Sequence, residues 1–178
     1  MNTLASIKIE DLRDYLARGW LTHDGMWFYN TAMKLGIREA NELNMAAIRS
    51  MAALEVNRTR KLLGGTFRME GLDDVMGYFN ASLQLVLPSS VFSRFKMMPV
   101  PPATFRWSWE KGECFAFKGI SQAGLIDGYR CGVIYRIECW LQALGVGYRL
   151  SPAIGGCLMH EKGSCEGEFT FDFPASTR

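Results

Sequence analysis

Hydrophobic positions divide the chain into two halves with different periods. In residues 1–87 apolar side chains recur every three or four positions, which is typical of helices. After Pro102 they recur at every second position, which is typical of strands. The sequence therefore predicts an α+β fold in which a helical N-terminal half packs against a C-terminal antiparallel sheet with a crossing helix. We expect a single domain over residues 1–178, with the helical half at 1–87 and the α+β half at 103–173.

Four helices are predicted in the first half from apolar spacing and from residues that favour helix ends. Their ranges are 6–19, 23–36, 38–65 and 69–87. Ser6 is expected to cap the first helix, and Ile9, Leu12 and Leu16 form its apolar stripe. Gly19 is expected to end it.

The second half is predicted to begin with a loop and a hairpin. Residues 88–102 contain "MMPVPP", and prolines are unfavourable in a helix or a central strand. Alternation of Phe105, Trp107 and Trp109, followed by a turn at 111–112, predicts a β-hairpin over 104–117. The remaining elements are a helix at 131–145 and strands at 146–156 and 166–173.

Charge and composition exclude several classes of protein. The net charge is only +2 and the basic residues do not cluster, so we expect no nucleic-acid partner. The N-terminus lacks the basic and apolar regions of a signal peptide. The longest uncharged run, residues 75–93, contains polar side chains and Pro88, so we expect no membrane span. A cytoplasmic protein is predicted, and its oligomeric state is left open.

The segment "CLMHEKGSC" at 157–165 concentrates sulfur and imidazole donors. Cys157, His160 and Cys165 are ligand types that suit Zn or Fe, and Cys131 is the expected fourth ligand because a helix N-terminus lowers the pKa of a thiol. Two alternatives remain open. The cysteines can form a redox-active pair, or they can be small buried residues beside an exposed His160 in a turn.

Two polar groups in the helical half are candidates for catalysis. His23 and Asp24 stand at the predicted start of a helix, where the imidazole can exchange protons and Asp24 can orient it. Glu55 and Arg58 share one face of the third helix, and a buried Glu55 would suit a general base. The alternatives are that Asp24 is only a cap beside His23, and that Glu55 and Arg58 form a surface ion pair.

The catalytic candidates are expected to share one site. His23 lies on one predicted helix, and Glu55 and Arg58 lie on another; each is a polar residue within an apolar run, so we predict that the three converge in one cavity. Trp27 and Trp107 are the expected aromatic walls for a flat small-molecule ligand, although such residues also serve as core.

Two stretches together resemble a known group of proteins. These are "LTHDGMWFYNTAMKLGIREANELN" with "LEVNRTRKLL", and the scattered C-terminal cysteines with "EFTFDF". They resemble a family of uncharacterised cytosolic bacterial and archaeal proteins, similar to the L-2-amino-thiazoline-4-carboxylic acid hydrolase-like group and more remotely to 4-vinyl-reductase-like small-molecule-binding domains. The chain departs from that pattern at His160, where relatives tend to carry a second cysteine.

The resemblance implies a hydrolase that opens a C–N bond in a small carboxylated heterocycle or amide. His23 or Glu55 would activate water, Asp24 would orient the imidazole, and Arg58 would hold the substrate carboxylate. The competing hypothesis is a non-catalytic metal-binding or thiol redox-sensing module built on the C-terminal cysteines.

Overall fold

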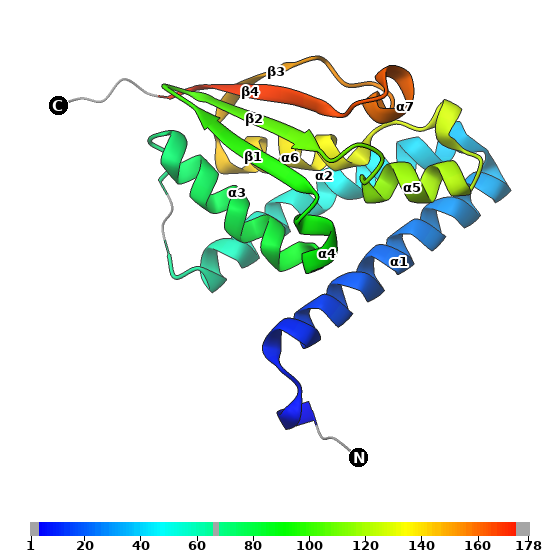
Figure 1. Cartoon of the computed structure of the whole chain (residues 1–178), viewed down its shortest axis with the longest axis horizontal. Coiled ribbons are helices and arrows are strands. Elements are labelled where there is room, and N and C mark those ends of the chain that lie inside the picture. The colour runs from blue at the N-terminus through cyan, green and yellow to red at the C-terminus, as the bar shows by residue number, and fades with distance from the viewer. Residues whose placement is uncertain (1–3, 66–67, 174–178) are drawn as a thin grey trace.

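The computed structural model of the chain describes residues 4–65 and 68–173. The predicted α+β class is confirmed. The elements in chain order are a 3-10 turn (Leu4–Ser6), α1 (Ile9–Leu35), α2 (Ile37–Leu62), α3 (Leu72–Val86), α4 (Ser89–Phe92), β1 (Phe95–Val100), β2 (Thr104–Trp109), α5 (Phe115–Gln122), a second 3-10 turn (Ile126–Gly128), α6 (Gly132–Leu144), β3 (Gly147–Ser151), α7 (Leu158–Lys162) and β4 (Glu166–Asp172). Helices α1, α2 and α3 of the N-terminal half lie with α6 beneath a four-stranded sheet (Figure 1).

Helix α1 is continuous where the sequence predicted two helices. It runs through Gly19 and Gly25, so the predicted end at Gly19 is wrong. An interior glycine costs a helix only about 1 kcal/mol, and packing of α1 against α2 outweighs that cost. Ser6 lies in the preceding 3-10 turn and Lys8 occupies the N-cap position, so the Ser6 cap is also wrong. Gly36, with φ of 92°, separates α1 from α2 as expected.

The sheet is antiparallel with strand order β1-β2-β4-β3. The predicted loop at 88–102 is wrong, because it contains α4 and β1. Strand β1 tolerates Pro99 because it is an edge strand and pairs on one side only. The predicted hairpin at 104–117 is wrong as well, since β2 turns back onto β1 and residues 115–122 form α5.

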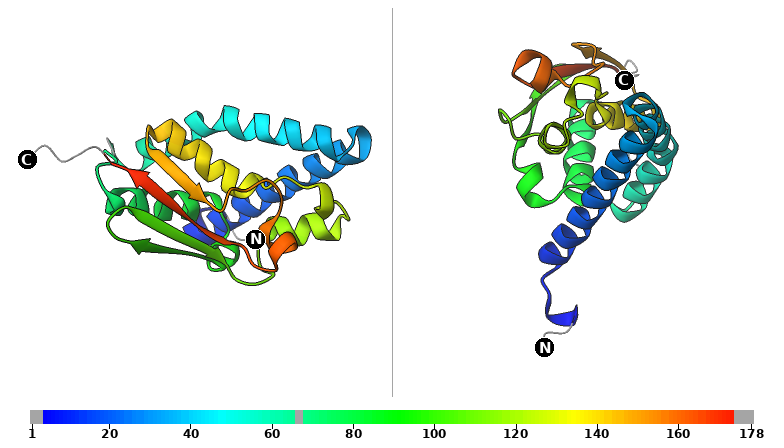
Figure 2. Two further views of the ribbon diagram at one scale, coloured as in Figure 1. Left: turned by 90° about the horizontal axis from the view of Figure 1, so that it is seen from above. Right: turned by 90° about the vertical axis from the view of Figure 1, so that its right-hand side faces the viewer.

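The core lies between the sheet and the helices. Phe105, Trp107 and Trp109 alternate toward it as predicted and are buried. Helix α6 crosses beneath the sheet and packs on α2 (Figures 1 and 2). Gly167 in β4 leaves room for the ring of Trp107 on the neighbouring strand β2, because a Cβ at Gly167 would lie 2.7 Å from that ring. Within the described residues, no helix is both long and apolar enough to cross a membrane.

Candidate small-molecule site

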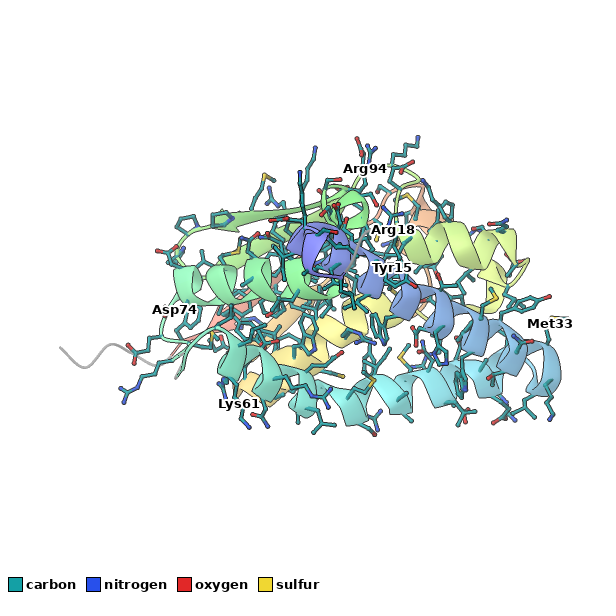
Figure 3. All side chains as sticks on the ribbon, turned by 90° about the horizontal axis from the view of Figure 1, so that it is seen from below. Tyr15, Arg18, Met33, Lys61, Asp74 and Arg94 are labelled. Atoms are coloured by element: carbon teal, nitrogen blue, oxygen red, sulfur yellow. The ribbon has the colours of Figure 1, made fainter. Side chains whose placement is uncertain are left out.

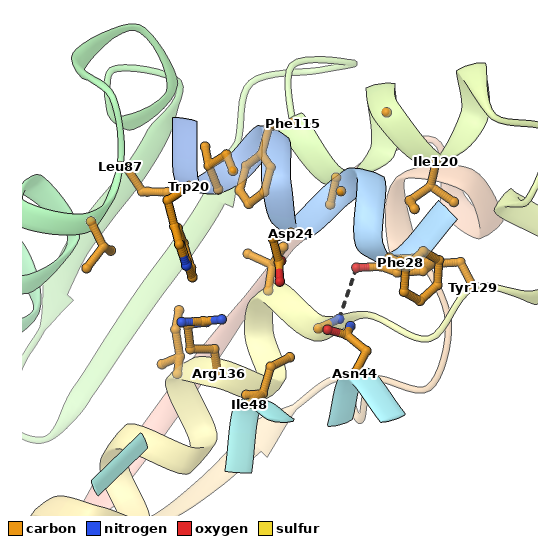
Figure 4. A pocket seen from close by; sticks show the side chains of 18 of the residues that line it. Trp20, Asp24, Phe28, Asn44, Ile48, Leu87, Phe115, Ile120, Tyr129 and Arg136 are labelled. Carbon is orange, nitrogen blue, oxygen red and sulfur yellow. Dashed lines mark hydrogen bonds between the residues drawn. The ribbon is translucent and has the colours of Figure 1, made fainter. Parts of the chain in front are cut away.

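A cavity of about 250 Å³ lies between the N-terminal helices and the C-terminal half (Figure 4). Helices α1, α5 and α6 form most of its wall, and residues of α2, α3, β1 and β2 complete it. The wall is predominantly apolar and rich in aromatic rings. Its aromatic members are Trp20, Phe28, Tyr29, Phe95, Trp109, Phe115, Tyr129 and Trp140.

Arg136 of α6 places a positive charge on the cavity wall. Its guanidinium lies 4.7 Å from the centre of the Trp20 ring, in cation–π contact. Behind it, Nη1 donates to Oε1 of Glu55 at 2.5 Å, and the indole of Trp140 donates to Oε2 of Glu55 at 2.8 Å. Arg136 and Glu55 are only 14% and 12% exposed, so solvent screens this pair weakly. The arrangement fixes the guanidinium between a carboxylate and a ring.

Tyr129 and Asn44 provide neutral polar groups elsewhere on the wall (Figure 4). The hydroxyl of Tyr129 accepts a hydrogen bond from the backbone N–H of Gly132 at 3.1 Å. Burial raises the pKa of Tyr129 well above its ordinary value, so the phenol keeps its proton. Gly132 permits the close approach of α6 to α2, since a Cβ there would lie 2.9 Å from Nδ2 of Asn44.

Asp24 is the one predicted catalytic residue that lines the cavity. It lies in the middle of α1, so its predicted role as a helix cap is wrong. His23 precedes it and is exposed, without being part of the cavity wall. On the continuous α1, Asp24 therefore lies at the cavity whereas His23 faces solvent.

The other predicted residues lie outside the cavity wall. Glu55 is held by Arg136 and Trp140, and Arg58 is exposed one turn further along α2. The sequence predicted that His23, Glu55 and Arg58 converge in one cavity. The structure does not bring them together there. The predicted aromatic walls do not line the cavity either: Trp107 is buried within the core and Trp27 is 46% exposed on α1.

Comparison with family models gives one match, over residues 3–91. The model describes a family of unknown function, DUF6125, and covers half of the chain. The chain belongs to this family. The matched region contains α1 to α4, and so includes Trp20 and Asp24 but not the Arg136 wall. Neither the search of curated proteins nor the search of solved structures found a match.

Four thiols gather in the C-terminal half of this DUF6125 chain. Cys114, Cys131 and Cys157 occupy the N-cap positions of α5, α6 and α7, and Cys165 precedes β4. Each lies close enough to others of the set to influence their pKa. Burial raises the pKa of Cys114 to about 12 and that of Cys131 to about 11. The predicted lowering at Cys131 is wrong, because desolvation outweighs the N–H groups of the helix terminus.

His160 is oriented toward a carboxylate rather than toward these thiols. Its Nε2 lies 2.9 Å from Oδ1 of Asp127, and the side chain is 41% exposed. Cys157 and Cys165 are buried, as the core alternative had proposed. Among residues 4–65 and 68–173, no group of three or more His, Cys, Asp or Glu side chains is arranged so that it could hold a metal ion.

Several residues of the cavity wall were not among the sequence candidates. Arg136 was assigned only to an amphipathic helix, and Asn44 and Tyr129 stood in no motif. One signal was available: Arg136 lies one position before Ile137 on a largely apolar helix. A charge at the border of a buried face indicates a partner in the core, but not which partner.

Proposed function

We propose that this protein binds a small, flat organic molecule in the cavity between α1, α5 and α6. The observation that carries the proposal is a predominantly apolar cavity with aromatic walls and a few fixed polar groups, which is the usual composition of a small-molecule site. An apolar ring would pack among Trp20, Phe115 and Trp140. A polar substituent would meet Arg136, Asp24 or Tyr129.

Cavity size limits the ligand to one or two rings. The volume of about 250 Å³ exceeds the roughly 150 Å³ cavity that accepts benzene in an engineered protein. It falls below the roughly 300–1,000 Å³ of pockets for drug-sized ligands.

In the enzymatic form of this proposal the base is Asp24, in place of His23 or Glu55. Opening a C–N bond requires a base beside the ligand, and Asp24 is the carboxylate on the cavity wall. Arg136 would take the role expected of Arg58, because its guanidinium faces the cavity and is held rigidly by Glu55. Binding without chemistry uses the same contacts and requires no base.

Intrinsic tryptophan fluorescence provides the test, because Trp20, Trp109 and Trp140 line the cavity. We expect benzoate and other non-fluorescent aromatic carboxylates to change the emission saturably. Cyclohexane, a probe without a polar group, should bind at least about tenfold more weakly. Asp24→Asn separates binding from chemistry: it should retain binding and abolish any hydrolysis of an aromatic amide. No saturable change with any aromatic probe would contradict the proposal.

A second proposal retains the metal-binding alternative. The observation that favours it is the gathering of four cysteines, two of which receive backbone N–H groups at the starts of α5 and α6. Such N–H groups stabilise thiolate ligands. The donor set would be Cys114, Cys131, Cys157 and Cys165, with Cys114 in place of His160. Because the described side chains do not form such a donor group as they stand, the four sulfurs would have to move together around a Zn or Fe ion and lose their protons.

Cobalt titration distinguishes this donor set from the one expected from the sequence. Co²⁺ bound by thiolates gives intense sulfur-to-metal charge-transfer absorption, so four cysteine ligands should produce it in apo protein. We expect Cys114→Ser to reduce that absorption by about a quarter or more and His160→Ala to leave it unchanged. Loss of the signal in His160→Ala would return His160 to the ligand set, and no signal in the wild type would reject the metal proposal.

A further inference from the structure

Helix α1 carries a second apolar surface on the side away from the protein body. Its buried side consists of Ala17, Phe28 and Ala32, together with the partly buried Leu21. On the opposite side, residues spaced alternately three and four apart form what we call the α1 stripe. The α1 stripe consists of Ile9, Leu12, Leu16, Gly19, His23, Met26, Asn30 and Met33.

The α1 stripe is open to solvent in the single chain. Ile9 is 73% exposed, Leu16 60% and Met33 63%, and only Leu12 is partly covered. The N-terminal part of α1 projects from the body, as the right-hand view of Figure 2 shows. Figure 3 labels Tyr15 and Met33 on this exposed helix, and Tyr15 is 75% exposed. A helix that is apolar on both sides is expected to be covered on both sides.

We propose that the α1 stripe is a self-association surface on which α1 of a second copy packs in antiparallel orientation. Spacing of three and four residues is the pattern by which two helices interlock along their length. The stripe extends over 24 residue steps, or about 36 Å of helix. The stripe contains no Asp, Glu, Lys or Arg. When two stripes meet, the seam between them therefore holds no acidic or basic side chains of these types that could repel one another.

The order of residues along the stripe selects the antiparallel arrangement. A two-fold axis at residue 21 places Leu16 of one copy opposite Met26 of the other, and Gly19 opposite His23. Large residues then face apolar or small ones throughout the centre. In a parallel pair, Gly19 would face Gly19 and leave a gap, while His23 would face His23.

The exposed area is sufficient for a dimer. Six large side chains on or beside the α1 stripe are about half exposed or more, and each therefore exposes roughly 100 Å², since a large side chain buries about 150–250 Å² when fully covered. They are Ile9, Tyr15, Leu16, Met26, Trp27 and Met33. Six such residues supply roughly 600 Å² per copy before backbone and polar atoms are added. A standard interface buries about 800 Å² per partner, so α1 supplies most of what is needed.

Sedimentation velocity of the full chain over a hundredfold concentration range tests the proposal. We expect a dimer for the wild type, and a dissociation constant raised by about a hundredfold or more in Leu16→Glu, which places two carboxylates in the seam. Leu54→Glu is the matched control, because Leu54 is 55% exposed on α2 and lies off the stripe. Circular dichroism melting at a concentration low enough for both variants to be monomeric should be the same for the two, since each side chain is largely exposed in the monomer.

Pulsed EPR on a label at Glu10→Cys tests the orientation. Glu10 lies in the first turn of α1 and is exposed off the stripe, whereas the native cysteines are buried or partly buried. An antiparallel pair separates the two labelled sites by about 33 Å along the helix axis, whereas a parallel pair brings them to within about 10 Å. A short distance, a monomeric wild type, or a dimer that Leu16→Glu and Leu54→Glu affect equally would overturn the proposal. Met33→Glu repeats the test at the far end of the stripe if Leu16→Glu does not fold.

Discussion

Glu55→Gln is expected to lower the free energy of unfolding by about 2–4 kcal/mol. The carboxylate neutralises Arg136 and accepts the indole N–H of Trp140, and both partners lie in a mostly dry region. Glutamine retains one acceptor but removes the charge, so the guanidinium is left without a counter-ion beside an apolar cavity. Urea unfolding measured by fluorescence checks the value.

The control for this change is Glu42→Gln, an exposed glutamate on the same helix, which should shift the unfolding free energy by less than about 0.5 kcal/mol. A double variant, Glu55→Leu with Arg136→Met, should recover part of the loss because neither charge remains unpaired. Unchanged stability in Glu55→Gln would contradict this structural role of Glu55.

The protein is expected to lose stability steeply as the pH rises from about 8.5 to about 11. Burial raises the pKa of Cys131 to about 11 and of Cys114 to about 12, and it raises that of Cys165 as well. The unfolded chain ionises its thiols near pH 8.5, so above that pH unfolding releases protons that the native state retains. Each such thiol then lowers the unfolding free energy by about 1.4 kcal/mol per pH unit.

Urea titrations between pH 7.5 and pH 10.5, with reductant and after chelation, measure this slope. The control is Cys131→Ala, which removes one of the titrating thiols, so its slope should be shallower by about 1.4 kcal/mol per pH unit even if the variant is less stable throughout. Equal slopes in the two chelated proteins would contradict the raised pKa of the Cys131 thiol in the metal-free native state.

The architecture was predictable where periodicity is long and local. Helices over 38–65 and 131–145 were expected within a few residues of α2 and α6, because an apolar spacing of three and four persists through each. Strand β1 was missed because the rule against proline in strands does not apply at a sheet edge, and edge position is decided by pairing with β2. The continuity of α1 through Gly19 was missed for a similar reason, since contacts with α2 outweigh the local preference.

The site was less predictable than the fold. Asp24 was identified because it stands beside His23 at the predicted start of a helix, although α1 is continuous there and the expected role as a cap was wrong. Arg136 was missed because its partner Glu55 lies 81 positions earlier, and no local pattern connects the two. Glu55 was recognised as a polar residue in an apolar run. Burial of such a residue requires a partner, and only the packing of α6 on α2 identifies it.

Obstructing the cavity tests the central claim most directly. Gly119 of α5 lines the cavity and is exposed, and a Cβ there would contact nothing within 4 Å. Gly119→Leu should therefore be accommodated and obstruct the opening of the cavity, while favouring the helix by about 1 kcal/mol. The matched control is Gly77→Leu in α3, an exposed helical glycine outside this cavity. We predict that titration with benzoate, followed by tryptophan fluorescence, shows binding to the wild type and Gly77→Leu and none to a folded Gly119→Leu. Equal binding to all three proteins would contradict a ligand site in this cavity.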